Sequence, residues 1–415
     1  MVKRYSNNSV FLSALICIIL FYSGLITLQN RNAYYSLIPG TKINALQGQL
    51  INSPAKTSDG QYYYAKMKVW NCEGQNIKSS AYGNIKVYIP ANIAEAFFPG
   101  KLYTPSGAFF EAGGIYKFEG RFGSDGKKFY ANNCSDHYFP KTVYGTLDYF
   151  RALCRLQFKR LMFSWGAGGG LLLALLCGAK EYTSSEVSLS FKNAGLSHIL
   201  ALSGMHLSMF SGIALFVGKK IGRKKLSFII RIIALVLFVW FAGFSPSLLR
   251  AFLCSFFMII AALANVEKPD LLLILAFSFL CQTIISPEDI YNSGFILSYA
   301  ALAGILLTNK FFRSMYNRIL PGYFANSLGS STGAQVFTAP VSLALFKSFA
   351  PIGIIATSIV SPVVTIFIYS GLALIVLCLL IPALAVPSGI FINLEYTVIK
   401  YLTGVFSKAP VWSIN

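Results

Sequence analysis

Residues 193–212 read NAGLSHILALSGMHLSMFSG. The stretch is apolar enough to enter a bilayer, yet it carries two of the three histidines of the chain, His198 and His206, together with four serines and three glycines. Polar groups are costly at bilayer depth, so they usually face a cavity, a partner helix or a substrate path. Leu and Ile alone would suffice for a structural anchor. The stretch therefore predicts a membrane segment that does more than hold the chain in place.

The composition of the whole chain is that of a membrane protein. Of 415 residues, 55% are hydrophobic and only 12% are charged, whereas a soluble domain carries about 25% charged residues. Apolar runs long enough to span a bilayer number roughly eight to ten, at about 20 residues per crossing. The net charge of +20 fits basic cytoplasmic loops and a polyanionic partner, either membrane lipids or nucleic acid. We therefore predict an α-helical polytopic membrane protein.

The first 140 residues contain an anchor and a soluble insert. Residues 1–40 hold an apolar run at 11–28 with two basic residues before it, which predicts an uncleaved transmembrane anchor with its N-terminus inside. Residues 41–140 are polar and show alternating patterns at 61–70 and 84–89, with Gly-containing turns between them. This pattern predicts a small all-β, OB-like domain on the extracytoplasmic side.

A helical region follows the insert. Residues 141–162 carry Arg151, Arg155, Lys159 and Arg160 at helical spacing, which predicts an amphipathic helix. Its basic stripe either lies in the membrane interface or faces water. Residues 163–415 form the polytopic part. Within it, the run at 351–383 is too long for one ordinary crossing, and we expect a break near Pro362.

The charges of the loops predict a topology with one irregular segment. Two basic clusters mark cytoplasmic loops, and they leave residues 243–247 and 287–289 outside; the clusters are Lys219, Lys220, Arg223, Lys224 and Lys225, and Lys310, Arg313 and Arg318. If residues 163–178 cross inward, a full crossing by residues 197–218 would put the first cluster outside. One of the two segments must be re-entrant, interfacial or broken. We expect this of 197–218, because Gly204 and Gly212 weaken a helix there.

The sequence predicts no catalytic residue, no metal ion and no cofactor. His198 and His206 are separated by about 80° and about 12 Å on a straight helix, so they cannot share one metal ion there. The chain has no HExxH motif and no G-x-S-x-G elbow. Two interpretations remain for the polar residues of this stretch: they line a polar path or hinge, or they make ordinary hydrogen bonds between helices. The residues concerned are Ser197, His198, Ser203, Gly204 and His206.

Two further membrane segments contain notable polar or small residues. Arg250 lies in the first turn of a helix that Ser245 and Pro246 begin, where it either snorkels to the interface or is a buried cation that meets a phosphate. Gly294 and Ser298 share one helix face, which predicts close helix packing. We expect Gly195 to serve packing in the same way.

The soluble insert offers two candidate features. Lysines alternate with aromatic residues, the composition of surfaces that bind single strands by stacking and phosphate contact, although alternation also builds a barrel core; the candidates for DNA contact are Lys66, Lys68, Trp70, Lys86 and Tyr88. Cys72 and Cys134 are the cysteines of the polar segment. In an oxidising compartment they are expected to form a disulfide, the alternative being two unrelated thiols.

Taken together, these segments resemble the ComEC family of competence proteins, the inner-membrane channels for DNA uptake. The insert, with VYIP at 87–90 followed by FPG at 98–100, resembles the N-terminal OB-like domain of that family. Ile296 departs from the pattern of the family, which has Gln there. The stretches that carry the resemblance are LLLALLCGAK at 171–180, FKNAGLSHILALSGMH at 191–206, SPSLLRA at 245–251, GFILSY at 294–299 and residues 335–340.

The resemblance implies a channel rather than an enzyme. Single-stranded DNA would enter from outside, contact the OB-like domain and thread past His198, Ser203 and His206, with Arg250 meeting a phosphate. The chain has no Walker A sequence and ends without the His-x-His-x-Asp-His motif of the metallo-β-lactamase-like domain found in many members. A cytoplasmic ATP-driven motor and a separate hydrolase domain are thus the expected partners, with single-stranded DNA and membrane lipids. A short member, a truncated gene product and half of a split system are the alternatives for the chain.

Two other functions fit the same residues. One is a non-conducting or degenerate structural homologue, and the other is a transporter of another polyanion or of a lipid-linked substrate.

Overall fold

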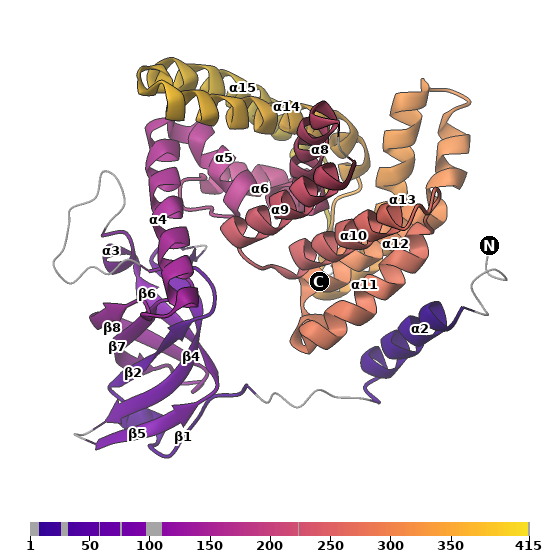
Figure 1. The fold of residues 1–415 in the computed structure, drawn as a ribbon. Helices are drawn as coiled ribbons and strands as arrows, with labels where there is room; N and C mark the ends of the chain where they lie inside the picture. Colours follow the sequence, from indigo (N-terminus) through magenta and orange to yellow (C-terminus); the bar gives the residue numbers. More distant parts are fainter. Residues whose placement is uncertain are drawn as a thin grey trace.

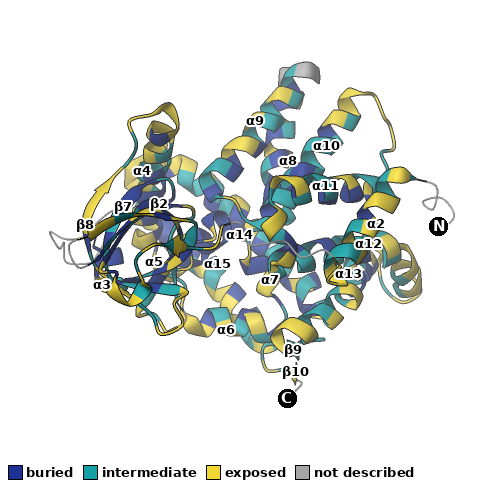
Figure 2. Cartoon of the chain, turned by 90° about the horizontal axis from the view of Figure 1, so that it is seen from below, coloured by how far each residue is buried: buried dark blue, intermediate teal, exposed yellow. Residues whose placement is uncertain are grey.

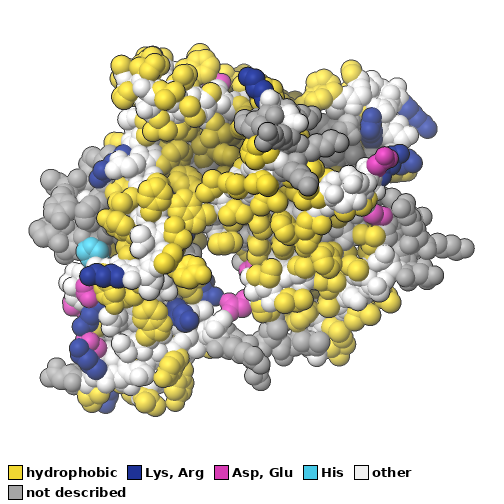
Figure 3. Space-filling view, in the orientation of Figure 1, with side chains coloured by type: hydrophobic (Ala, Val, Ile, Leu, Met, Phe, Trp, Pro, Cys, Tyr) yellow, Lys and Arg dark blue, Asp and Glu magenta, His cyan; other side chains and the backbone are white. Residues whose placement is uncertain are grey.

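The computed structural model describes residues 8–25, 32–57, 59–74, 77–96, 110–222 and 224–413. The motif at 98–100 and Arg223 of the basic loop lie outside these residues. The described chain forms a β domain and a helical body, and the long helix α4 (Val143–Ser164) rises from the first to the second (Figure 1). Hydrophobic side chains cover most of the helical body on the face shown in Figure 3, and many charged side chains gather over the β domain.

The β domain is a closed barrel of five strands. Each strand pairs with two neighbours in the order β4–β2–β7–β8–β6 and back to β4, and only β6 and β8 run parallel. Side chains alternate along each strand, so that Leu46, Met67, Val87, Phe118 and Phe129 fill the interior with 0% exposure. The five strands are β2 (Ala45–Leu50), β4 (Tyr62–Gly74), β6 (Asn84–Pro90), β7 (Ile115–Phe122) and β8 (Lys128–Tyr138).

Short elements extend or close this barrel. Strands β5 and β1 continue the sheet beyond β4, β3 pairs with β4, and helix α3 follows β6. Their bounds are β1 (Tyr35–Ser36), η1 (Gly40–Lys42), β3 (Ala55–Lys56), β5 (Ile77–Tyr82) and α3 (Ala91–Ala94).

The predicted disulfide between Cys72 and Cys134 is not formed. Both residues are buried free thiols, on strands β4 and β8, with β2 and β7 between them in the sheet. The Cys134 thiol donates a hydrogen bond to the carbonyl oxygen of Asp136 at 3.4 Å. Burial raises the pKa of both thiols, to about 12 for Cys134. The two side chains therefore serve as small core residues of the barrel.

The helical body consists mainly of apolar helices. Within the described residues, four segments are long and apolar enough to cross a membrane: α10, α12, α14 and Pro382–Phe406, while α2, α5, α8, α9 and α11 contain shorter apolar stretches. The bounds are α2 (Ser9–Tyr22), α5 (Gly166–Cys177), α6 (Ser185–Asn193), α7 (Ser197–Leu200), α8 (Gly204–Ile221), α9 (Lys224–Ala242), α10 (Pro246–Leu263), α11 (Leu271–Ile285), η2 (Pro287–Tyr291), α12 (Ser293–Tyr316), α13 (Gly322–Phe346), β9 (Ser348–Phe349), α14 (Gly353–Leu380), η3 (Pro382–Leu384), α15 (Ala385–Phe406) and β10 (Trp412–Ser413).

The segment that raised the topology question is interrupted. Helices α7 and α8 are separated by the non-helical residues 201–203, so the break expected in 197–218 is present. Helix α5 is also short, since its 12 residues span about 18 Å, against a hydrocarbon core of about 30 Å. Residues 168–177 of α5 are all buried. Figure 2 shows such buried positions inside the barrel and on the inner faces of the helices.

The predicted break at Pro362 is wrong. Helix α14 continues for 28 residues, with Pro362 inside it. Proline removes one backbone hydrogen bond, but the residues on both sides of it are held by packing, because Ala356, Val360, Val364 and Phe367 are each 0% exposed. Tertiary packing outweighs the local cost in this helix.

The prediction for the basic stripe of α4 is also wrong for its central residues. Arg155 and Lys159 are only 4% and 5% exposed, and neither lies in the interface or in water. Arg155 Nε lies 3.3 Å from a carboxylate oxygen of Glu111, in the segment before β7. Lys159 Nζ lies 3.3 Å from Glu111 and 3.1 Å from Glu181, which follows α5. Two carboxylates that are remote in the sequence thus cover the stripe. We call these four residues the junction cluster.

The outward side of α4 carries apolar residues instead. Val143, Tyr144, Leu147 and Phe150 are each about half exposed or more, and they recur at helical spacing. Phe150 also stacks on Trp240 of α9, with ring centroids 6.2 Å apart. The first half of α4 therefore presents an apolar, aromatic stripe, while Arg155 and Lys159 of the second half point into the protein.

Glu111 remains ionised inside the junction cluster. Burial raises the pKa of its carboxyl, but Arg155 and Lys159 lower it more, and the pKa falls to about 2. Burial likewise lowers the pKa of Lys159, whereas Glu181 and Glu111 raise it above its ordinary value. The junction is thus held by charged groups, and the removal of either sign would leave a buried charge without a partner.

We predict that Glu111→Gln destabilises the protein by about 3–5 kcal/mol, because Arg155 would be left buried without its carboxylate and Lys159 would lose one of its two carboxylate contacts. The matched control is Glu73→Gln. Glu73 also bridges two lysines, Lys117 and Lys78, but its side chain is 29% exposed, so the expected loss is about 1 kcal/mol or less. Thermal unfolding of both purified variants in one detergent tests this. Equal unfolding midpoints would contradict a structural function for the cluster.

Candidate functional site

Gly195 lies at a sharp turn that ends α6. Its φ of +71° and the hydrogen bonds Leu196 N–H to Phe191 O (2.8 Å) and Gly195 N–H to Lys192 O (3.0 Å) form a Schellman motif. The turn packs on the start of α14, because a Cβ at Gly195 would lie 3.0 Å from Gly353 Cα. Two facing glycines thus let the chain before α7 lie directly against the end of another helix.

His198 lies in α7 just after this turn. His198 and its neighbour Ser197 are both exposed.

His206 and Ser203 lie at the start of α8. The Ser203 amide donates to His206 Nδ1 at 3.2 Å, and the Ser203 hydroxyl lies 3.3 Å from the same nitrogen. Since Nδ1 accepts the amide, the ring proton is on Nε2. His206 is 0% exposed, and its Nε2 has no hydrogen-bond partner within the described residues. His206 therefore caps the break between α7 and α8 from one side and keeps one donor free.

Arg250 joins three helices at the same place. Its Nη1 donates to the carbonyl oxygen of Ser298 in α12 at 2.9 Å. Its Nη2 would lie 3.3 Å from a Cβ at Gly204, so the guanidinium rests against the first residue of α8. Its Nε is buried without a partner, and no carboxylate pairs with Arg250 in the part of the chain that the structure describes. An uncompensated cation thus lies beside a helix N-terminus, which is itself partly positive.

Gly294 and Ser298 hold α12 against this arginine. The Ser247 hydroxyl of α10 donates to the Gly294 carbonyl at 3.0 Å, one turn before the contact between Arg250 and Ser298. The structure therefore brings together Ser203, Gly204, His206 and Arg250, with the two small residues of α12 as support. His198 and Gly195 belong to the neighbouring α6–α7 turn rather than to this group.

The β domain carries a cluster of tyrosines on its outer surface. Tyr88 of β6 stacks on Tyr130 of β8 with ring centroids 5.1 Å apart, and it lies 6.3–6.5 Å from Tyr64 and Tyr62 of β4. These side chains point outward, because the alternating positions Tyr63, Ala65 and Val87 are buried. Together with the lysines on the same three strands they form the tyrosine–lysine face, defined as Tyr62, Tyr64, Tyr88, Tyr130, Lys66, Lys68, Lys86 and Lys128.

The lysines of this face are arranged unfavourably for stability. Lys66 lies directly opposite Lys86, and Lys86 is level with Lys128 on the next strand. Like charges directly opposite one another destabilise a sheet. Neither Lys68 nor Lys86 forms an ion pair within the described ranges. Trp70, the remaining predicted residue, lies further along β4 and is 37% exposed.

Sequence reasoning missed Tyr130 and Lys128. Both enter the face through the parallel pairing of β6 with β8, in which Tyr88 meets Tyr130 and Lys86 meets Lys128. Only the period-2 pattern of β8 could have pointed to them, and that pattern does not say which strands become neighbours.

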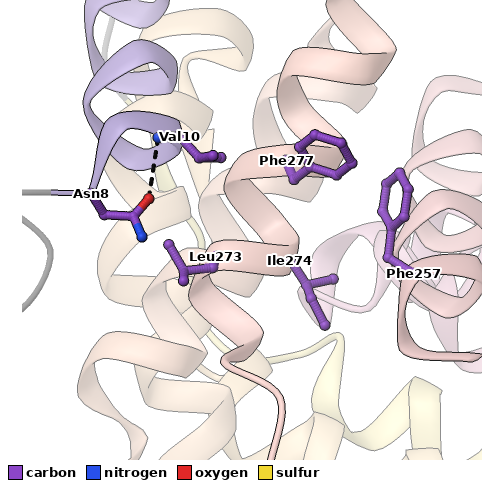
Figure 4. Close-up of a pocket in the computed structure, with 6 residues that line it drawn as sticks. All are labelled: Asn8, Val10, Phe257, Leu273, Ile274 and Phe277. Atoms are coloured by element: carbon purple, nitrogen blue, oxygen red, sulfur yellow. Dashed lines mark hydrogen bonds between the residues drawn. The ribbon is translucent and has the colours of Figure 1, made fainter. Parts of the chain in front are cut away.

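Other features of the molecule offer no comparable chemistry. An apolar pocket of about 230 Å³ lies between α2, α10 and α11 (Figure 4), and Asn8 lines it while its side chain caps α2. No group of three or more His, Cys, Asp or Glu that could hold a metal ion occurs among the described residues.

Apolar helices of spanning length and a small barrel define the class of this molecule: it is a helical polytopic membrane protein with a small β domain. A sequence model of the Competence protein family matches residues 175–415, which is more than half of the chain. The chain belongs to this family.

Two relatives support this assignment. The ComE operon protein 3 of Bacillus subtilis (strain 168) is 27% identical over 208 residues, which cover 49% of this chain and 25% of that protein. An uncharacterized protein of Aquifex aeolicus (strain VF5) is 27% identical over 240 residues, which cover 57% of this chain and 53% of that protein. The matched part thus spans a quarter of one relative and about half of the other. No solved structure matches the chain.

We predict that Gly195→Ala destabilises the protein by about 1–2 kcal/mol through its left-handed backbone alone, and further through the 3.0 Å approach to Gly353. Gly212→Ala is the control. Gly212 is helical, and its added Cβ would meet only Tyr369 Oη at 3.9 Å, so this change should be neutral or stabilising. Thermal unfolding in detergent compares the two; a Gly195→Ala variant as stable as the wild type would exclude the tight turn.

Proposed function

We propose that this protein is an inner-membrane channel through which single-stranded DNA enters the cell during natural transformation. One observation carries the proposal: the guanidinium of Arg250 lies against the N-terminus of α8 inside the helical body, and no carboxylate among the described residues neutralises it. A helix N-terminus and an arginine both attract anions, and phosphate suits both. Membership of the Competence protein family and the similarity to the ComE operon protein 3 of Bacillus subtilis support DNA uptake as the setting.

The site has the properties that a transport path for a polyanion needs. A single cation with few donors binds a phosphate firmly enough to select anions and weakly enough to release them, as conduction requires. A contact between Arg250 and a phosphate carries no sequence information, so binding at this site would not depend on the DNA sequence. Ser203 and His206 border the same break between helices, and His206 Nε2 has no hydrogen-bond partner in the described part of the chain.

The tyrosine–lysine face has the composition of a surface that binds the incoming DNA strand. In OB-like barrels the second and third strands bind oligonucleotides, and β4 and β6 are the second and third strands of this barrel. Tyrosine rings stack on bases of any kind, while lysines contact the phosphates. Lys66, Lys68, Lys86 and Tyr88 were predicted for this purpose, and Tyr62, Tyr64 and Tyr130 complete the surface.

We assign the β domain to the extracytoplasmic side. The loop charges leave residues 243–247 and 287–289 outside, and both regions adjoin α4 or the β domain. Arg155 donates to the carbonyl oxygen of Phe241 at 2.8 Å, and Glu288 contacts Lys66. The uptake of DNA further requires a cytoplasmic ATP-driven motor, and a hydrolase domain for the strand that is not transported would be a separate partner.

Two other proposals make different predictions. A non-conducting structural homologue would use Arg250 only for its hydrogen bond to Ser298, and a transporter of another polyanion would not affect transformation. Deletion of the gene distinguishes them from the channel, because a deletion strain that transforms normally would contradict DNA uptake.

We predict that Arg250→Gln lowers the transformation frequency about ten-fold or more, because one charge-assisted phosphate contact is lost. Arg250→Lys should retain part of the activity. Arg231→Gln is the control, since Arg231 is another arginine in an apolar helix, and its guanidinium donates to the Ser211 hydroxyl at 3.3 Å. Membrane levels of each variant are measured in the same strains. Wild-type transformation by a well-inserted Arg250→Gln variant would remove this residue from the path.

We predict that Tyr88→Ala weakens the binding of oligo(dT) to the purified full chain by about five-fold or more, because at least one stacked base is lost. Tyr82→Ala is the control, since Tyr82 is 66% exposed on β5, outside the closed barrel. Binding of wild type should also fall with rising salt. If both variants bind like the wild type, the face is not a DNA surface.

A further inference from the structure

Glu288, in the η2 loop between α11 and α12, reaches across to the β domain. One carboxylate oxygen lies 2.8 Å from Lys66 Nζ, and the other accepts a hydrogen bond from the Asn32 side-chain amide. The side chains of Lys66 and Glu288 are 41% and 47% exposed, so the pair is open to solvent. The hydrogen bonds from Lys66 and Asn32 lower the pKa of Glu288, which keeps it ionised.

This contact lies on the tyrosine–lysine face itself. Lys66 is directly opposite Lys86 on the neighbouring strand, and its outward neighbour on β4 is Tyr64, whose ring lies 6.3 Å from that of Tyr88. The carboxylate therefore occupies the place beside the tyrosines that a phosphate of a bound strand would take. Two oxygens that accept from an ammonium group and an amide are also the contacts that a phosphate would make.

The next residue of the η2 loop, Asp289, is connected by hydrogen bonds to the helices around Arg250. Asp289 accepts a hydrogen bond from Gln282 Nε2 at 3.2 Å, and the same nitrogen donates to the carbonyl oxygen of Pro246 at 3.1 Å. Pro246 begins α10, one turn before Arg250. The Gln282 side-chain oxygen accepts from Tyr299 of α12 at 3.0 Å, next to the Ser298 carbonyl that binds Arg250. Gln282 is 0% exposed, so these bonds are shielded from water.

We propose that Glu288 is a built-in competitor for DNA phosphate at Lys66. The proposal rests on the proposed function of the tyrosine–lysine face. In the free protein, Glu288 holds the face against the η2 loop. A strand that binds the tyrosines places a phosphate at Lys66, displaces the carboxylate and frees η2, the loop next to the helix ends that carry Arg250. The exposed pair is weak enough to exchange, because such pairs contribute little to stability.

The test measures oligo(dT) binding to the full chain in detergent at low salt. Glu288→Gln is expected to raise the affinity about two- to five-fold, which corresponds to the loss of one exposed ion pair. Glu267→Gln is the matched control. Glu267 is an exposed residue on the loop between α10 and α11, so this substitution removes the same charge at a site away from the face. Lys66→Gln and the double variant Lys66→Gln/Glu288→Gln complete a double-mutant cycle, which isolates the coupling between the two side chains.

Each outcome decides the proposal. The proposal is supported if Glu288→Gln raises the affinity for oligo(dT), Glu267→Gln does not, and the increase is absent from the double variant compared with Lys66→Gln alone. If Glu288→Gln raises the affinity equally in the Lys66→Gln background, the increase reflects the change in net charge and contradicts the proposal. If the wild type binds oligo(dT) and Glu288→Gln changes nothing, the competitor is wrong while the face keeps its proposed function. If neither the wild type nor any variant binds, both proposals are wrong.

Discussion

The buried contact of Glu111 with Arg155 and Lys159 sets the position of everything else in the molecule. This contact joins the barrel to α4, and the contact of Lys159 with Glu181 joins α4 to the segment after α5. Arg155 also donates to the carbonyl oxygens of Phe241 and Ala242 at the end of α9. Buried ion pairs add little net stability, but the loss of one partner is very costly. The junction therefore specifies one arrangement of barrel and helices, and in that arrangement Glu288 of η2 contacts Lys66 of the β domain.

The distribution of charge follows from this arrangement. In the junction cluster two cations meet two carboxylates, so no charge remains for a ligand. At Arg250 and on the tyrosine–lysine face the balance is different, because Arg250, Lys68 and Lys86 have no carboxylate partner within the described residues. Charge without a partner in or near a low-dielectric region attracts counter-charge strongly. Arg250, Lys68 and Lys86 therefore remain available to a negatively charged ligand, whereas Arg155 and Lys159 join the barrel to the helices.

The sequence predicted local features well and contacts between remote segments poorly. Alternation in β4 and β6, the cap at Ser245 and the break before Gly204 are local, and the structure contains all three. The burial of Arg155 could not be inferred, because Glu111 lies in another domain. The break predicted at Pro362 was wrong for a related reason. Proline does remove a backbone hydrogen bond of the helix, but packing against residues remote in the sequence outweighs this cost. Tyr130 and the separation of Cys72 from Cys134 both depend on strand order, which residue spacing does not encode.

The polar stretch at 193–212 owes its character to the break within it. An unbroken helix would satisfy its own backbone amides, whereas a helix that starts at Gly204 leaves its first N–H groups without partners inside the helix. His206 Nδ1 accepts from the Ser203 amide, just before the start of this helix. The absence of a side chain at Gly204 lets Arg250 approach the same end. Irregular backbone at membrane depth is tolerated where protein or a water-filled path satisfies it, and the proposed anion site depends on the break, the glycine and the histidine together.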